Sequence, residues 1–155
     1  MRAVISTVIG MAMAATGCTS VGSYPSQTYM PNNGANADLK GMLYLRNAFL
    51  LSGTEENSPS PQLALYAVLI NTGSQPVRLD GITADGGSVQ LAGPITLPPN
   101  QPVGTGDKPI GTVTGVRSAT VPMTFAFSGT GPMRVNVPVQ SRAGEYANLP
   151  TATAG

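Results

Sequence analysis

Apolar and polar residues alternate most regularly near the C-terminal end of the chain, on both sides of the turn Ser128–Pro132. On each side of this turn large apolar residues recur at every second position, and polar residues such as Thr124, Arg134 and Asn136 lie between them. A period of two is typical of half-buried antiparallel strands, because successive side chains point to opposite faces. The pattern predicts a β-hairpin whose inward-facing residues are Val121, Met123, Phe125, Phe127, Met133, Val135, Val137 and Val139.

Other segments of strand character recur at intervals of about 8–12 residues, with turns rich in Gly and Pro between them. Residues 63–71, LALYAVLIN, are apolar on both faces, which suits a central strand that is covered on both sides. The predicted strands before the hairpin are residues 42–51, 63–71, 77–84, 88–91, 94–97 and 111–116. We therefore predict one all-β domain over residues 42–140, an antiparallel β-sandwich of about seven strands.

The first eighteen residues have a different pattern. Arg2 is followed by an apolar stretch, residues 3–15, which is shorter than the roughly 20 residues of a transmembrane helix. A basic start, a short apolar run and small residues before a cleavage point are typical of a secretory signal. Cys18 directly after Gly17 indicates a lipoprotein signal, because its thiol can take a diacylglyceryl group. An ordinary signal peptide with an incidental Cys is the alternative.

The signal divides the chain into further segments. We expect residues 1–17 to be the signal peptide and residues 18–41 to be the lipidated Cys18 followed by a flexible tether, because the tether is rich in Ser, Thr, Asn, Gly and Pro. Residues 141–155 are small, polar and unpatterned, and we expect a disordered tail. This organisation predicts a protein on the extracytoplasmic side of the cell membrane, with membrane lipid as a partner through Cys18.

Composition excludes several function classes. The chain has eight Lys and Arg residues and seven Asp and Glu residues. Because Arg2 belongs to the signal, the mature chain has a net charge near zero and no basic patch for nucleic acid. The chain has no His, and Cys18 is its single Cys. This removes the commonest general base, most nucleophile–base pairs and nearly all zinc chemistry. We expect no catalytic residue and no cofactor, and therefore no enzyme.

Methionine sulfur is the remaining soft metal ligand. Met30 falls in the tether, and Met42 opens a predicted strand. Met123 and Met133 have core parity, so we interpret them as gap fillers of the core rather than as ligands.

The acidic residues form one adjacent pair, Glu55 and Glu56, in a loop rich in Ser and Pro. We interpret the pair as part of a solvated loop, with calcium binding as the alternative. Asp80, Asp85 and Asp107 are scattered beside or close to Gly, as expected of turn residues.

Several pieces between Met42 and Gln140, in this order, resemble the periplasmic copper chaperones of the PCuAC type. The pieces are LRNA at 45–48, LYAVLINTG at 65–73, VRLDGI at 77–82, ITLPPNQ at 95–101, VPMTFAF at 121–127 and VNVPV at 135–139. The resemblance implies a cupredoxin-like or immunoglobulin-like β-sandwich. It is a resemblance to divergent members of the family, of the kind found among actinobacterial lipoproteins.

The metal ligands of that family have no counterpart in this chain. The family uses a His after a Val-x-Leu strand, a Met further on, and then a His-x-Met pair. Here Val89-Gln90-Leu91 is followed by Ala92, the Met-bearing segment is missing before Gly93, and the pair falls on Ile110 and Thr112. The resemblance therefore argues against copper delivery by the usual site, and we predict no metal ligands.

These observations predict a lipid-anchored, non-enzymatic binding or scaffolding protein, with a protein partner at the membrane surface and a membrane protein complex as the partner class. The alternative is a copper metallochaperone that uses Met ligands in a non-standard site.

Overall fold

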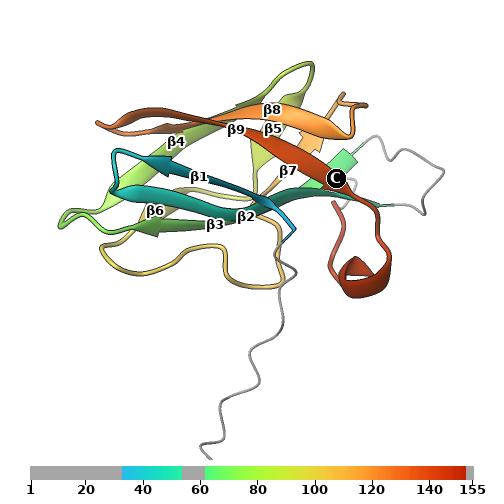
Figure 1. The fold of residues 1–155 in the computed structure, drawn as a ribbon, viewed down its shortest axis with the longest axis horizontal. Helices are drawn as coiled ribbons and strands as arrows, with labels where there is room; N and C mark the ends of the chain where they lie inside the picture. Colours follow the sequence, from blue (N-terminus) through green and yellow to red (C-terminus); the bar gives the residue numbers. More distant parts are fainter. Residues whose placement is uncertain (1–32, 54–61, 153–155) are drawn as a thin grey trace, which may run out of the picture.

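The computed structural model describes residues 33–53 and 62–152 (Figure 1). Within these ranges the chain forms nine strands and one short 3-10 helix, so the predicted all-β class is confirmed, with more strands than the seven or so expected. The elements are β1 (Ala35–Leu39), β2 (Leu43–Ser52), β3 (Gln62–Asn71), β4 (Val77–Ala84), β5 (Ser88–Leu91), β6 (Ile95–Leu97), β7 (Gly111–Thr114), β8 (Thr120–Phe127), β9 (Gly131–Gln140) and η1 (Gly144–Tyr146).

The strands form one curled sheet in the order β5-β7-β3-β2-β9-β8-β4-β6, and β1 pairs with β2 beside this path. Neighbouring strands are antiparallel except β2 and β9, which pair in parallel at Leu50↔Val139 and Leu51↔Gln140. This short contact joins two halves that lie over each other, with β8 and β9 above β2 and β3 in Figure 1. The apolar side chains between the two halves form the main core.

The closing hairpin has the predicted parity. Phe125 and Val137 are fully buried, while Arg134 and Asn136 are exposed and Thr124 is half-buried. Opposite residues pack against each other across the hairpin, as in the pair Phe125↔Met133. The alternation in the sequence therefore identified the register that places the large apolar side chains inside.

Strand β1 lies within the range 18–41, which we predicted to be a tether, so that prediction was wrong for its last residues. Ala35, Ala37 and Leu39 are half-buried against the main core, while the residues between them are exposed. The physical reason is pairing rather than hydrophobicity. β1 supplies hydrogen bonds to the edge of β2 that β9 does not reach, and its small side chains bury little area.

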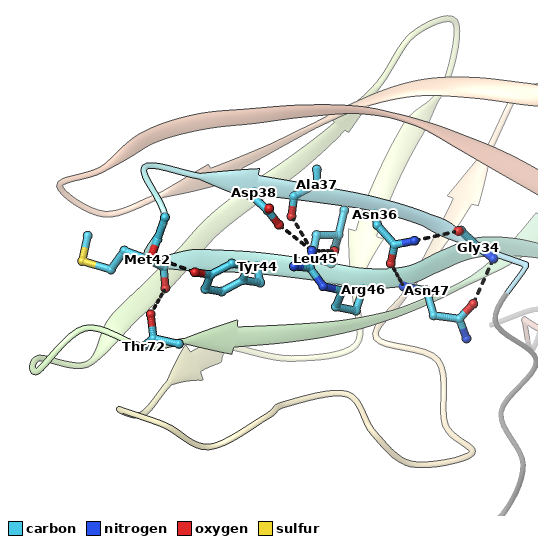
Figure 2. Close-up of polar contacts among 11 residues, drawn as sticks. Gly34, Asn36, Ala37, Asp38, Met42, Tyr44, Leu45, Arg46, Asn47 and Thr72 are labelled. Atoms are coloured by element: carbon cyan, nitrogen blue, oxygen red, sulfur yellow. Dashed lines mark hydrogen bonds and ion pairs between the residues drawn. The ribbon is translucent and has the colours of Figure 1, made fainter.

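β2 has a bulge at Asn47, where its register with β3 shifts, and the partner on its other edge changes from β1 before this point to β9 after it. Asn47 has a φ of 50°, a left-handed conformation that Asn tolerates better than most residues. The side-chain Oδ1 of Asn47 accepts a hydrogen bond from the backbone N–H of Gly34 at 2.9 Å. The backbone N–H of Asn47 donates to the side-chain Oδ1 of Asn36 at 3.0 Å (Figure 2). A side chain at Gly34 would collide with the Asn47 backbone, so Gly is required here.

A second, smaller core lies on the outer face of β2 and β3. Residues 144–149 pack over this face and are called the C-terminal cover. Phe49 and Tyr66 stack with ring centroids 5.0 Å apart, and the Tyr146 ring packs on Phe49 at 5.1 Å. Tyr146 and Leu149 are buried there, so the prediction of a disordered tail over residues 141–155 was wrong for this part. The cause is that β2 and β3 are apolar on both faces, and their outer face needs a cover.

The hydroxyl of Tyr66 ties this cover to the sheet. Its oxygen lies 2.6 Å from the carbonyl oxygen of Pro150, to which it donates, and 3.2 Å from that of Asp107. Burial, and then the negative charge of Asp107, raise the pKa of Tyr66 to about 12. The folded state therefore favours the neutral phenol more than the unfolded chain does, whose tyrosines ionise near pH 10.

This shift predicts a loss of stability in alkali. The contribution of Tyr66 is complete below about pH 10 and is lost as the pH rises toward about 12, since the unfolded state releases the proton first. Tyr66→Phe removes one hydrogen bond and should lower the free energy of unfolding by about 1 kcal/mol at neutral pH. Urea unfolding from pH 8 to 11.5 should show the gap between wild type and variant closing above pH 10. Parallel pH profiles would contradict this assignment.

Candidate functional site

The three positions where the resemblance places metal ligands lie together at one end of the β5–β7 pair. Ala92 follows β5, Ile110 precedes β7 and Thr112 lies within it. The Ala92 amide donates to the Ile110 carbonyl at 2.9 Å, so the two backbones are in direct contact. Ile110 is buried and forms part of the main core. The fold thus brings these positions together, but their side chains are a methyl group, an aliphatic chain and a hydroxyl.

An open pocket of about 690 Å³ lies beside these positions. It is lined by residues 88–91 of β5 with Ala92, by Thr112 and Thr114 of β7 and by Gln62 at the start of β3. Every polar side chain in this lining is uncharged, and Ser88 Oγ lies 2.8 Å from Thr114 Oγ1. Our sequence reasoning missed this pocket, because its residues come from three separate segments and match no motif.

The methionines do not converge on a ligand site in the described part of the chain. Met123 and Met133 are buried in the main core, as their parity predicted. Met42 is half-buried in the turn between β1 and β2, where its carbonyl accepts hydrogen bonds from Thr72 (Figure 2). Because Thr72 follows β3 and Gln62 begins it, Met42 lies at the end of the sheet opposite to the pocket. Met30 lies outside the described residues.

The carboxylates are engaged locally or exposed. Asp80 accepts hydrogen bonds from Ser128 and Arg78, at 2.8 and 2.9 Å, and these two contacts hold its pKa below the ordinary value. Asp38 pairs with Arg46, whose guanidinium also lies over the Tyr44 ring (Figure 2).

The other predicted candidates add no site. Asp85 and Asp107 are exposed, and Glu55 and Glu56 lie outside the described residues. In residues 33–53 and 62–152, no three His, Cys, Asp or Glu side chains come together in a group that could hold a metal ion.

Asn33, which precedes β1, lies beside η1. The Asn33 side-chain amide donates to Glu145 of η1 at 2.9 Å, and Gly34 is held by Asn47. Cys18, the predicted lipid attachment site, lies outside the described residues. No helix within the described ranges is long and apolar enough to cross a membrane.

Solved structures of PCuAC domains match the fold of this chain. The copper-bound PCuAC domain from PmoF2 is 22% identical to the chain, with a TM-score of 0.56, over 68% of this chain and 97% of that domain. The apo PCuAC domain from PmoF1 is 17% identical, with a TM-score of 0.56, over 68% of this chain and 98% of that one. This chain has the PCuAC-type fold.

A further match, the apo PmoF2 PCuAC domain, is 19% identical with a TM-score of 0.55, over 70% of this chain and 97% of that one. The PCuAC-type, cupredoxin-like fold expected from the sequence is therefore confirmed. No family model matches the sequence, and no curated protein matches it. The likeness of this chain to the PCuAC domains thus lies in the fold, at low sequence identity.

Proposed function

We propose that the protein is a lipid-anchored, non-enzymatic binding domain of the cell envelope, which holds a protein partner at the outer side of the membrane. One observation carries this proposal. In a domain with the PCuAC-type fold, the end of the β5–β7 pair has Ala92, Ile110 and Thr112 in place of metal ligands and opens into an uncharged polar pocket. A β-sandwich with such a site retains its surface and edges as means of recognition.

The side chains at this end of the sheet do not fit copper. Soft ions such as copper(I) prefer several convergent sulfur or imidazole ligands. Ala92 and Ile110 offer no donor atom, and the single hydroxyl of Thr112 is a hard donor. The chain has no His to replace these ligands from another segment. We therefore assign no metal-dependent function to the β5–β7 end of the sheet.

The anchoring part of the proposal rests on the residues Ala15 to Cys18. A diacylglyceryl group on Cys18 would hold the chain at the membrane without a basic patch, which suits a mature chain with a net charge near zero. The domain would then sit on a tether that starts at Cys18 and reaches the sheet at Gly34, where Asn47 fixes the incoming chain. The domain would then bind its protein partner at the membrane surface.

Cys18→Ser tests the anchor. The hydroxyl cannot take the thioether-linked lipid, so we expect the variant to accumulate as an uncleaved precursor or to appear in the medium. Cell fractionation with immunoblotting, together with the intact mass of the purified protein, measures both outcomes. A variant that is processed normally and stays in the membrane would show that the lipid anchor is wrong.

The binding role is tested by purification in mild detergent from native membranes, followed by mass spectrometry. We expect a stable membrane protein partner in constant stoichiometry. Recovery of the protein alone, carrying copper, would contradict the proposal and favour a metallochaperone that uses methionine ligands.

A further inference from the structure

We propose that the outer face of β2 and β3 is the surface that binds the protein partner, and that the C-terminal cover is a removable strap which the partner displaces. The partner presents a peptide segment with an aromatic side chain and, three residues later, a leucine. This inference rests on the binding role proposed above and names the surface and the chemistry of the partner.

The outer face of β3 is apolar from residue 64 to residue 70. The even-numbered residues of this stretch alternate with residues of the main core, so they point to the outer face. Ala64 and Tyr66 are buried in the second core, whereas Val68 and Ile70 are only half-buried. On β2, Tyr44 lies opposite Ile70 and is also half-buried (Figure 2). The cover therefore closes one half of an apolar face and leaves the other half partly exposed.

The cover is attached to the sheet through side chains. Among the described residues, the backbone N–H groups of the cover donate to carbonyls of the cover itself or of the residue just before it. The Tyr146 ring packs on Phe49 with centroids 5.1 Å apart, Leu149 is buried in the same small core, and Tyr66 donates to the Pro150 carbonyl. A segment with few buried side chains opens at a lower free energy than the sheet beneath it. The cover can therefore leave while β2 and β3 stay paired.

The present occupant of the face shows what a competing segment must supply. Tyr146 supplies an aromatic ring that packs on Phe49 at an interplanar angle of 60°, and such tilted aromatic pairs are favourable. Leu149 supplies an aliphatic side chain three residues later. The Pro150 carbonyl supplies an acceptor for the Tyr66 hydroxyl at 2.6 Å. A partner segment with the same order of aromatic ring, leucine and carbonyl makes the same three contacts.

The uncovered half of the face gives a longer segment an advantage over the cover. Such a segment can also contact Val68 and Ile70, and burial of apolar area stabilises association. It can reach Tyr44, whose ring carries the Arg46 guanidinium at 4.9 Å from its centroid, and Tyr and Arg are enriched among the residues that dominate interfaces. The cover has the advantage of belonging to the same chain, which gives it a high effective concentration. It therefore excludes weak segments and yields to one that uses both halves.

The experiment titrates the isotope-labelled full-length chain in detergent micelles with the peptide acetyl-Gly-Glu-Tyr-Ala-Asn-Leu-Pro-Thr-amide, which copies residues 144–151. Tyr146→Ala removes the ring that holds the cover, so this variant should bind the peptide at least tenfold more tightly than the wild type. We expect saturable NMR shifts at the residues under the cover, which are Phe49, Leu51, Ala64 and Tyr66. Equal affinity of variant and wild type, shifts elsewhere on the domain, or no saturation of the variant at millimolar peptide would overturn the proposal.

Asn148→Ala is the matched control, because Asn148 is an exposed residue of the cover and its truncation should leave the affinity at the wild-type value. Leu149→Ala removes the second anchor and should act as Tyr146→Ala does, so the test does not depend on the folding of one variant. Thermal unfolding checks that each variant retains the fold. A peptide that carries the Tyr146→Ala change should bind at least tenfold more weakly. Unchanged binding of that peptide, or a gain in affinity with Asn148→Ala equal to that with Tyr146→Ala, would show that the face does not select this chemistry.

The uncovered half of the face is tested with the native partner. Ile70→Ser removes apolar surface that lies outside the cover, so purification in mild detergent should recover at least fivefold less of the partner found with the wild type. Ala126→Ser places the same side chain at an exposed position of β8 and should not change the recovery. Equal recovery with the two variants would overturn the proposal.

Other outcomes separate this inference from the proposed function. A partner recovered with the wild type, combined with no peptide binding under the cover, would remove this inference and leave the proposed function standing. Shifts at the same residues that depend on protein concentration alone would assign the face to a second copy of the chain and overturn the inference. Recovery of no membrane partner would contradict the proposed function, and with it this inference, whatever the peptide does.

Discussion

Replacing Phe125 with alanine is expected to lower the free energy of unfolding by about 3–5 kcal/mol, the usual cost of truncating a buried aromatic side chain. Phe125 is fully buried in the main core and lies opposite Met133 in the closing hairpin. The substitution leaves a cavity between the two halves of the sheet, because strands paired on both sides cannot collapse into it. Chemical denaturation with a common m-value measures the loss.

Thr124→Ala is the matched control for this prediction. Thr124 is adjacent in sequence but points to the other face, where it is half-buried. Its truncation should cost well under half as much as that of Phe125. Equal losses at the two positions would show that the register of β8 is wrong, and with it the packing of the two halves of the sheet.

Asn71→Ala should be the second large effect, with a loss of about 2–5 kcal/mol. Asn71 is fully buried at the end of β3. Its side-chain amide donates to the carbonyls of Gln75 and Leu97, at 2.8 and 3.0 Å, and its Oδ1 accepts from the Gly73 amide at 2.9 Å. Alanine would leave these backbone groups without partners inside the protein, at about 1–3 kcal/mol for each group that stays buried.

The location of these bonds explains why one side chain matters so much. They join the end of β3 to the turn before β4 and to β6, and these elements belong to opposite halves of the sheet. Asn136→Ala, at an exposed position of β9, should change stability by at most about 0.5 kcal/mol. Similar values for the two variants would contradict the structural role of Asn71. Hydrogen exchange should also become faster around Gln75 in the Asn71 variant.

Local patterns predicted the parts of the fold in which local pairing and burial agree. The hairpin of β8 and β9 is such a part, because each large apolar residue faces the core and its neighbours face solvent. The central position of β3 was also predictable, because this strand is apolar on both faces. The sequence quoted for the resemblance, LYAVLINTG, ends in Asn71 and Gly73, and the structure gives both residues a defined role in one turn.

Elements defined by distant partners were not predictable in the same way. β1 has small residues at its inward positions, Ala35 and Ala37, so its apolar signal is weak. It is a strand because β2 offers it an edge. The C-terminal cover has only two anchors, Tyr146 and Leu149. The need for a cover followed from β3, but parity says nothing about which distant segment provides it.

The candidate site shows the same limit more strongly. Ala92, Ile110 and Thr112 were singled out by resemblance, and the fold does bring them to one end of the β5–β7 pair. The pocket beside them involves Gln62, which is distant in sequence, and uncharged residues that any strand could contain. Recognising the pocket required the pairing of β3, β7 and β5, which only the structure shows.

Copper(I) competition against a chromogenic chelator tests most directly the proposal that this chain combines the PCuAC-type fold with an absence of copper binding. The control is the triple variant Met42→Leu, Met123→Leu, Met133→Leu, because exchange of Met for Leu conserves volume and keeps the core. We predict that the wild-type chain leaves the copper with the chelator, as the variant does. Stoichiometric binding at nanomolar or tighter affinity, lost in the variant, would contradict the claim and identify the protein as a metallochaperone with methionine ligands.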